Sequence, residues 1–541
     1  MSVSLDLADI QGNILTGYGR AGFPKGRFLL FHVDRGDVGR HFVLGLLPSI
    51  TTAQRWNSKQ AIPTGKAKVE RPLVAVNIAF TWYGLLALGV PVRTLQGMPD
   101  EFIDGMAKRA SLLGDDFVGP NWRQSWDEVW IESGNDNGSH PDTVHILVAL
   151  NAQMKPDGTP VEALETRTRE IEALAQRTGG VRLLTGHNRK GQPKERYQEL
   201  SAILRQKEDG TCEALPKEHF GFTDGIGDPV FEGQYPDGYE EKFKTGNGAL
   251  DGQGHWRPIA TGEFLLGYPD EAQELPPAAG PLTFSRNGTF MAYRKVRQHV
   301  AAFQDFINKT AEQFGAVFGL ENPDEARETL LAKLAGRWTD GVPVSAAPTF
   351  ADWKAFNSQY PESNSEARYA ALTHFSFKED PKGLKCPMTA HLRRVNTRDQ
   401  LDPTGQDGSV INNRRRILRR GLPYTYSPDG SHDQEEQGLV LLFLCASLFR
   451  QFEFVQQQWI NNGMDANAGS DTCPITGNHS DGQAGLGPKA KFVIPSDPAS
   501  GRPPFIVEGL PQFIETRGGD YFFVPSLTAL RMIGLGIIDP T

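Results

Sequence analysis

Apolar and polar positions in the first third of the chain alternate in a way that predicts four strands and two helices. The helices are predicted at 37–47 and at 161–174, where apolar residues recur on one helical face. Runs rich in β-branched and aromatic residues predict the strands, at 27–33, 73–81, 143–150 and 181–184. The resulting order, β-α-β-β-α-β, is that of a split βαβ unit.

A looser version of the same order follows in the rest of the chain. Helices are predicted at 300–314 and 452–462, and strands at 289–296, 439–446 and 520–527. The long polar stretches 321–366 and 396–412 are predicted to be loops or insertions. A polar segment at 205–211 marks the expected boundary between an N-terminal domain, residues 1–210, and a C-terminal domain, residues 211–541.

Composition and charge narrow the class of protein. Of the 541 residues, 39% are hydrophobic and 22% are charged, which is typical of a soluble globular chain. The net charge of −9 argues against a nucleic-acid or anionic-membrane binder. The most apolar run, 438–449, is also well short of the roughly 20 residues that span a bilayer.

The cysteines and the start of the chain bear on the compartment. Four scattered cysteines are too few for a disulfide framework, and no C-x-x-C pair offers a thiolate zinc site. The sequence MSVSLDLADIQGNIL has no basic head followed by an apolar stretch, so no signal peptide is visible. We therefore expect a cytoplasmic location, although a twin-arginine export substrate given without its leader would look the same.

The stretch EHFGFTDGIGDP, residues 218–229, places Asp224 and Asp228 in a turn built around Gly225 and Gly227. It matches neither a calcium-binding hand nor a phosphate-binding loop. On its own, the pattern is that of an Asx-type turn with glycine at positive φ. The flanking apolar and aromatic residues leave open a buried carboxylate with a chemical role.

A second stretch, CPMTAHLRRVNTRD at 386–399, surrounds His391 with arginines. Positive neighbours disfavour a protonated imidazole, which suits a neutral histidine acting as a metal ligand. Cys386 offers a rival, a thiolate ligand to haem, although free cysteines are more often small buried hydrophobes. A purely structural histidine is the remaining interpretation.

Five of the seven residues at 414–420 are arginine. A solvated basic patch or a nucleic-acid stripe is one interpretation. The Ile417-Leu418 step instead suggests a strand, on which Arg415, Ile417 and Arg419 share one face. An inward-facing arginine needs an anion, which a carboxylate such as Asp224 or a dianionic cofactor would supply.

Five segments, taken together and in this order, resemble the dye-decolourising peroxidases: DIQGNIL, NIAFTWYGLLALGV, HFGFTDGIGDP, CPMTAHLRR and ILRRGLPY. The resemblance begins at Asp9 and covers nearly the whole chain, and the length is similar to that of the larger bacterial and fungal members. It implies an α+β fold of two ferredoxin-like domains with antiparallel sheets and peripheral helices. It also implies haem b, bound in the C-terminal domain.

The resemblance assigns roles to three residues. The family's G-x-x-D-G motif falls on 221–225, which implies that Asp224 is the distal acid–base residue. Its A-H-[IL]-R motif implies that His391 is the proximal iron ligand, and its I-[LV]-R segment implies that Arg419 is the distal charge stabiliser. The residue after the G-x-x-D-G-I step is often Ser in relatives and is Gly227 here.

Other residues are expected around the haem. Arg398 resembles the family's propionate-binding arginine. A carboxylate hydrogen-bonded to His391 would strengthen the electron donation of its imidazole to iron. Asp471 is our first choice for this carboxylate, with Glu453 in reserve. The remaining residues expected to contact the cofactor are Gly225, Ile226, Gly227, Leu442 and Phe443.

The function implied is that of a haem peroxidase that uses H₂O₂ to oxidise bulky aromatic compounds and dyes, with Tyr424 as a candidate relay to the surface. Two alternatives are a haem-binding protein for haem transfer or iron handling, with incidental peroxidase activity, and a basic-patch nucleic-acid binder. The expected partners are H₂O₂ and aromatic reductants, without nucleic acid or membrane. The expected assembly is a monomer or a small homo-oligomer.

Overall fold

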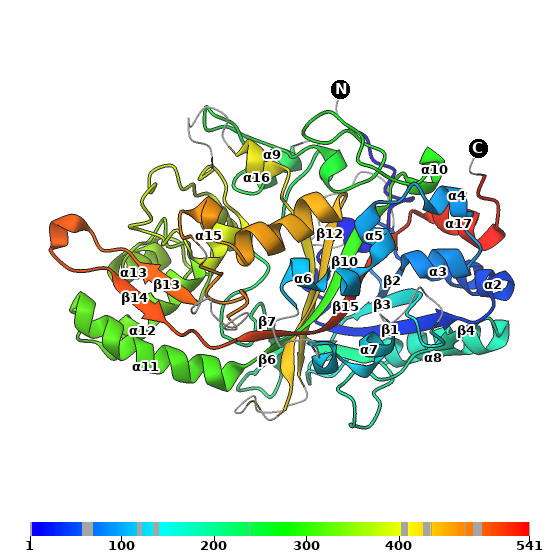
Figure 1. The fold of residues 1–541 in the computed structure, drawn as a ribbon, viewed down its shortest axis with the longest axis horizontal. Coiled ribbons are helices and arrows are strands. Elements are labelled where there is room, and N and C mark those ends of the chain that lie inside the picture. The colour runs from blue at the N-terminus through cyan, green and yellow to red at the C-terminus, as the bar shows by residue number, and fades with distance from the viewer. Residues whose placement is uncertain are drawn as a thin grey trace.

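The computed structural model of the chain describes residues 3–56, 69–115, 122–133, 140–236, 238–401, 409–425, 433, 435–469, 471–479 and 490–539. Within these residues, nine strands form one antiparallel sheet through the centre of the molecule (Figure 1). The strands along it are β11 (Leu418–Thr425), β12 (Gln437–Cys445), β10 (Thr289–Gln298), β15 (Ile514–Val524), β2 (Val74–Phe80), β3 (Ile146–Ala152), β1 (Lys25–Val33) and β4 (Val181–Leu183), with β5 (Gln198–Ser201) also paired to β1.

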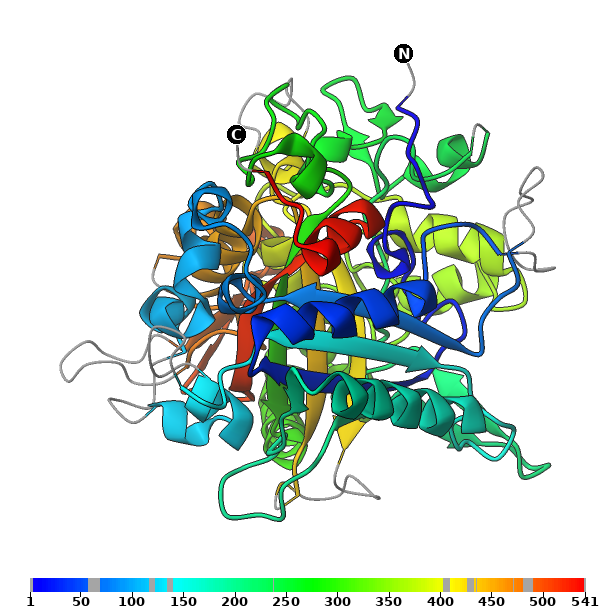
Figure 2. The same ribbon diagram turned by 90° about the vertical axis from the view of Figure 1, so that its right-hand side faces the viewer.

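The N-terminal half has the predicted order β1-α2-β2-β3-α8-β4, with α2 at Gly36–Leu46 and α8 at Glu162–Thr178. Helix α8 buries Leu164, Ile171 and Leu174 on the predicted face and ends at Gly179, whose φ of 68° only glycine adopts without strain. Helices α2 and α8 contact each other and lie side by side over one face of the strands (Figure 2).

The C-terminal half repeats the order as β10-α11-β11-β12-η5/η6-β15, with α11 at Val300–Phe318 and the π-helical segments η5 and η6 at Leu448–Glu453 and Val455–Ile460. In both halves the four strands lie side by side in the order second, third, first, fourth. This shared topology confirms the predicted α+β class with two ferredoxin-like units. The halves join where β15 pairs with β2 at Phe523 and Phe80.

The stretch 321–366, predicted to be a loop or an insertion, is largely helical. Helices α12 (Pro323–Ala335) and α13 (Phe350–Gln359) lie there, and α14 (Ser365–Thr373) begins there. Their caps are readable: the Asn322 side chain accepts the N–H groups of the first turn of α12, and Thr349 forms a capping box on α13. The polar composition hid helices that cover one end of the molecule, with α11 and α12 far from α2 and α8 (Figure 1).

Smaller elements connect these units. The hairpin β6–β7 (Ile203–Gln206 and Cys212–Leu215) links the halves, and the boundary predicted at residue 210 falls in its turn. The other helices and strands are α1 (Gly12–Leu15), α3 (Trp82–Ala87), α4 (Val92–Leu95), α5 (Asp100–Asp104), α6 (Ala110–Leu113), α7 (Glu128–Ser133), α9 (Tyr239–Lys244), α10 (Leu282–Ser285), α15 (His391–Val395), α16 (Val410–Asn413), α17 (Leu527–Leu535), β8 (Ala249–Leu250), β9 (Trp256–Arg257), β13 (Lys491–Ile494) and β14 (Phe505–Glu508).

Both faces of the sheet are covered by hydrophobic cores. On β1, Leu29 and Phe31 pack into one core while Phe28 and Leu30 pack into the other, as strand alternation requires. Each of these two cores draws residues from both halves of the chain. Among the described residues, no helix combines the length and the apolar character needed to cross a bilayer.

Candidate active site

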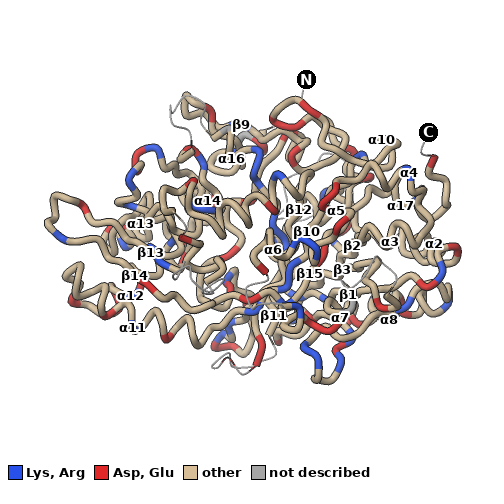
Figure 3. Tube along the Cα trace, in the orientation of Figure 1, with Lys and Arg blue, Asp and Glu red and all other residues tan. Residues whose placement is uncertain are grey.

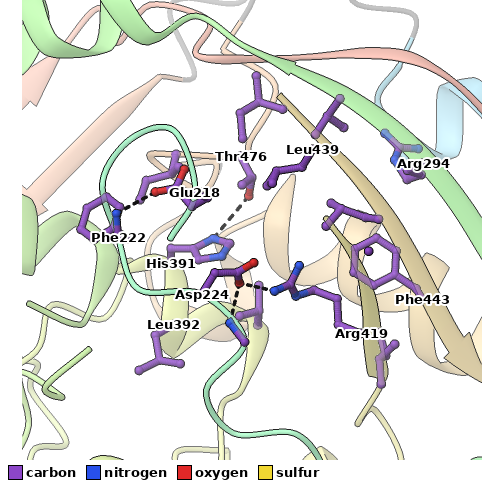
Figure 4. A pocket seen from close by; sticks show the side chains of 18 of the residues that line it. Glu218, Phe222, Asp224, Arg294, His391, Leu392, Arg419, Leu439, Phe443 and Thr476 are labelled. Carbon is purple, nitrogen blue, oxygen red and sulfur yellow. Dashed lines mark hydrogen bonds and ion pairs between the residues drawn. The ribbon is translucent and has the colours of Figure 1, made fainter. Parts of the chain in front are cut away.

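A cavity of about 780 Å³ lies in the C-terminal half, between the β11–β12 edge of the sheet, the loop at 216–229 and helix α15 (Figure 4). Its volume is in the range of sites for cofactors and small molecules, roughly 300–1,000 Å³. The wall contributed by β12 consists of Leu439, Leu441 and Phe443. The opposite wall includes Leu392 and Val395 of α15.

Strand alternation corrects one prediction about this wall. Phe443 lines the cavity, but Leu442, its neighbour on β12, points to the other face and packs into a hydrophobic core. On β12 the residues that line the cavity, Leu439, Leu441 and Phe443, alternate with residues that face this core. Tyr424 is buried on the core side of β11, where its hydroxyl donates to Glu436 at 2.7 Å, and its role as a relay stays a prediction.

The loop at 216–229 brings Asp224 into the cavity. Its backbone turns at Gly221, Gly225 and Gly227, with φ of 101°, 77° and 83°, where residues with a side chain are disfavoured. The Glu218 carboxylate accepts the N–H groups of Phe220 and Phe222 at 2.9 and 2.8 Å, which fixes the turn before Asp224. The predicted contact residues Gly225, Ile226 and Gly227 all line the cavity.

Asp224 and Arg419 form an ion pair that faces the cavity (Figure 4). Asp224 Oδ1 accepts hydrogen bonds from Arg419 Nη2 and, at 2.6 Å, from the N–H of Gly225. The two side chains keep 31% and 29% of their exposure because they face this space. Burial alone would raise the pKa of Asp224. The charge and the hydrogen bond of Arg419 lower this pKa by more than burial raises it, so the net pKa lies below its usual value.

Asp228, the second carboxylate of the loop, has a different partner. It accepts two hydrogen bonds from Arg420 Nη1, at 2.9 and 3.0 Å. Arg420 also donates to the carbonyls of Asn13 and Ile14 in α1. This pair therefore ties the loop, β11 and the N-terminal segment together, while Asp224 faces the cavity.

His391, the first residue of α15, lines the cavity (Figure 4). Its Nδ1 lies 3.2 Å from Cys473 Sγ and 3.4 Å from Thr476 Oγ1. Burial raises the pKa of the Cys473 thiol, but the neighbouring His391 outweighs it and lowers the pKa to about 6. Sequence reasoning missed Cys473, although it stands two residues after the predicted Asp471.

The predictions of a carboxylate behind His391 are wrong. Asp471 pairs with Lys491 at 3.6 Å, and Glu453 accepts hydrogen bonds from Arg109 and Tyr521. The rival iron ligand Cys386 is buried away from the cavity wall, and burial raises the pKa of its thiol to about 11.

Arg398 does not reach the cavity wall. It is buried, donates to the carbonyls of Phe375 and Gly246, and stacks on the Phe375 ring at 3.7 Å. Arg337, Arg415 and Arg416 line the cavity instead. Burial lowers the pKa of each of the three to about 10, and their hydrogen bonds in the described part of the chain run only to backbone carbonyls.

The arginine-rich stretch is not a solvated basic patch. Arg414 pairs with Asp270, and Arg419 and Arg420 pair with the carboxylates of the loop at 216–229. Basic and acidic residues are interspersed along the trace (Figure 3). The interpretation as a nucleic-acid stripe therefore has no structural support in the described residues.

The structure is thus an α+β protein of two ferredoxin-like units joined in one sheet, in which a carboxylate, an arginine and a histidine meet in a cofactor-sized cavity of the second unit. Residues 9–182 match the family model of the DyP dimeric alpha+beta barrel domain. The chain is 28% identical to Peroxidase 2 of Mycetinis scorodonius, over 98% of this chain and 88% of that protein. It is also 28% identical to a dye-decolorizing peroxidase of Exidia glandulosa, over 97% and 87%.

Solved structures of dye-decolorizing peroxidases are similar to this chain in fold. A dye-decolorizing peroxidase solved in complex with 2,6-dimethoxyphenol superposes with a TM-score of 0.69 at 23% identity, covering 98% of this chain and 100% of that one. The family model, the curated relatives and the solved structures all identify a peroxidase of the dye-decolourising type. The chain is thus a peroxidase, an oxidoreductase that uses hydrogen peroxide as its oxidant.

Proposed function

We propose that this peroxidase binds haem b in the cavity of its C-terminal half and oxidises bulky aromatic compounds and dyes. The observation that carries the proposal is the Asp224–Arg419 ion pair, which shares one cofactor-sized cavity with His391. The haem, when bound, supplies an iron that exchanges electrons with peroxide and with the reductant.

The residues present fit such a cofactor. A porphyrin needs flat apolar walls, which Leu439, Leu441 and Phe443 offer, and its iron needs an axial ligand. His391 is suited to that role because its Nδ1 is turned toward Cys473, which leaves Nε2 for the iron. Arg337 and Arg416, two cavity cations bonded only to carbonyls in the described chain, are suited to the propionates.

Asp224 is the acid–base residue of the proposal. The reaction requires one proton of H₂O₂ to move from the oxygen nearer to the cofactor (the inner oxygen) to the one farther from it (the outer oxygen). A carboxylate with a lowered pKa is ionised at neutral pH, so Asp224 can accept that proton and return it. The Arg419 guanidinium, fixed beside it, stabilises the negative charge that develops on the outer oxygen.

The reducing substrates and the setting are part of the proposal. The complex of a structural relative with 2,6-dimethoxyphenol supports phenolic and other aromatic reductants. The four cysteines are free thiols, which suits the reducing cytoplasm. We further propose a monomer or a small homo-oligomer, which analytical ultracentrifugation of the purified protein would test.

The test is the spectrum of the purified protein and of two histidine variants. We expect a Soret band in the wild type and loss of most haem, or altered ligand-field bands, in His391→Ala. His255→Ala is the control, because His255 is largely exposed and lies outside the cavity lining. Wild-type haem content and spectrum in His391→Ala would place the ligand elsewhere.

Turnover separates a peroxidase from a haem carrier. With H₂O₂ and an anthraquinone dye, we expect steady-state rates far above those of free haem at equal concentration. Rates near that background would favour haem transfer or iron handling as the native task.

A further inference from the structure

Among the residues that the structure describes, a sulfur atom and no carboxylate lies behind the histidine of the cavity. Cys473 Sγ is 3.2 Å from His391 Nδ1, a close approach for sulfur. The two carboxylates predicted for this position, Asp471 and Glu453, pair with Lys491 and Arg109. The hydrogen-bond partner of the imidazole is therefore set by Cys473 and its neighbour Thr476.

The position of this sulfur is fixed by its backbone. Cys473 is fully buried, its N–H donates to the carbonyl of Ile460 at 2.7 Å, and its own carbonyl accepts the N–H of Gly477 at 3.0 Å. The Thr476 hydroxyl lies 3.3 Å from Sγ and donates to it. A sulfur atom held in this way can accept a hydrogen bond in a constant direction.

The tautomer of His391 decides which group donates. If Nε2 faces the cavity as a metal ligand, the proton of the neutral ring resides on Nδ1, so Nδ1–H is the donor. In the described part of the chain, the two acceptors within reach are Cys473 Sγ and Thr476 Oγ1. The Thr476 hydroxyl already directs its proton to Sγ, which makes the sulfur the point where both donors converge.

We propose that Cys473 is the positioning residue of this peroxidase: its Sγ accepts the hydrogen bond of His391 Nδ1, orients the ring and raises its basicity toward the haem iron. Such partners behind a metal-bound histidine commonly change metal affinity or activity by about 10–100-fold. Sulfur is a weaker acceptor than a carboxylate, so His391 carries less anionic character than it would with an aspartate. The proposal rests on the proposed function, since it takes His391 as the ligand.

The test replaces the acceptor and reads the iron–histidine bond. In the ferrous haem protein, we expect Cys473→Ala to shift the Fe–His stretching band to lower wavenumber and to raise the haem reduction potential. Cys473→Asp should shift both the other way, because a carboxylate accepts more strongly. Cys445→Ala is the matched control, because Cys445 is as buried as Cys473 but lies on β12 in another core.

Two further variants keep the outcome decisive. If Cys473→Ala does not retain haem, Cys473→Val, which fills similar space without an acceptor, replaces it, with a downward shift of the same band expected. Thr476→Val removes the rival acceptor and should shift the band less than the loss of the Cys473 sulfur does. Bands and potentials equal to wild type in the Cys473→Val and Cys473→Asp variants, or a larger shift in Thr476→Val, would overturn the proposal. A failure of His391 itself appears separately, as an unchanged spectrum in His391→Ala.

Discussion

Asp224 and Arg419 form an ion pair whose members act on one reaction. Asp224→Asn removes the proton acceptor, and Arg419→Leu removes the positive charge beside the developing anion. Each change should slow the reaction with H₂O₂ by roughly 10²-fold or more, the usual scale for such groups. Haem binding should be spared, because neither residue is a proposed ligand. Stopped-flow rates near wild type in both variants would reject the mechanism, and a single slow variant would assign the chemistry to that residue.

The same pair predicts a pH dependence. Burial raises the pKa of Asp224, and Arg419 together with the Gly225 N–H lowers it more, so the carboxylate stays ionised to lower pH than an ordinary aspartate. Because the ionised form accepts the proton, the reaction with H₂O₂ is lost as pH falls through this lowered pKa. In Arg419→Leu the pKa of Asp224 rises, so the loss should set in at higher pH.

The measurement is the second-order rate constant for H₂O₂ as a function of pH. Arg419→Lys is the charge-retaining control, and the pH at which its rate constant falls should lie nearer to that of the wild type. If the rate constant of Arg419→Leu falls at the same pH as that of the wild type, Arg419 does not control the ionisation of Asp224.

Between elements, the Asp228–Arg420 pair holds the loop at 216–229 against β11 and α1. The Arg420 side chain is only 4% exposed, so in Asp228→Asn its charge would lose its counter-charge in a poorly hydrated place. We expect a loss of about 1–3 kcal/mol in the free energy of unfolding, measured by urea denaturation of the protein. Asp251→Asn, at a 42% exposed carboxylate, is the control that should change little. Equal midpoints for the two variants would contradict this role.

Helices and strands with a clear period were predictable from the sequence. The helices α2, α8 and α11 lie where they were predicted, and the strands β1, β2, β3, β10 and β12 lie where runs rich in β-branched and aromatic residues predicted them. Helices α12 and α13 were missed because their polar residues dominate the composition, although Asn322 and Thr349 marked their starts. On β12, Phe443 faces the cavity and Leu442 faces a core, because neighbouring strand residues face opposite sides of the sheet.

The candidate site could also be predicted only in part from the sequence. Asp224, Arg419 and His391 meet in one cavity as the resemblance implied, because each stands in a continuous motif. The partner of His391 comes from a segment 82 residues further along the chain, and no local pattern distinguishes Cys473 from Asp471 as that partner. Only the fold of the segment at 471–479 decides which side chain faces the ring.

At the scale of the whole molecule, buried ion pairs connect the two halves of the chain. Although the chain carries a net charge of −9, buried cations such as Arg294 and Lys295 on β10 pair with Asp115 and Asp127 at 2.6 and 2.7 Å. Both aspartates come from the N-terminal half. Removing one partner of a buried pair leaves an uncompensated charge, so these pairs make each half depend on the other.

The last prediction is that the two ferredoxin-like halves do not fold independently. Tyr293 on β10 packs against Phe28 and Trp130 of the N-terminal half, with ring centroids 6.2 and 5.1 Å apart. A fragment of residues 1–210 would expose this surface and leave Asp115 and Asp127 without their cations. We expect the fragment to aggregate or to unfold without a cooperative transition, while the full chain unfolds in one calorimetric transition. A soluble 1–210 fragment with a cooperative transition of its own, or two separate transitions in the full chain, would show that the boundary near residue 210 divides independent domains.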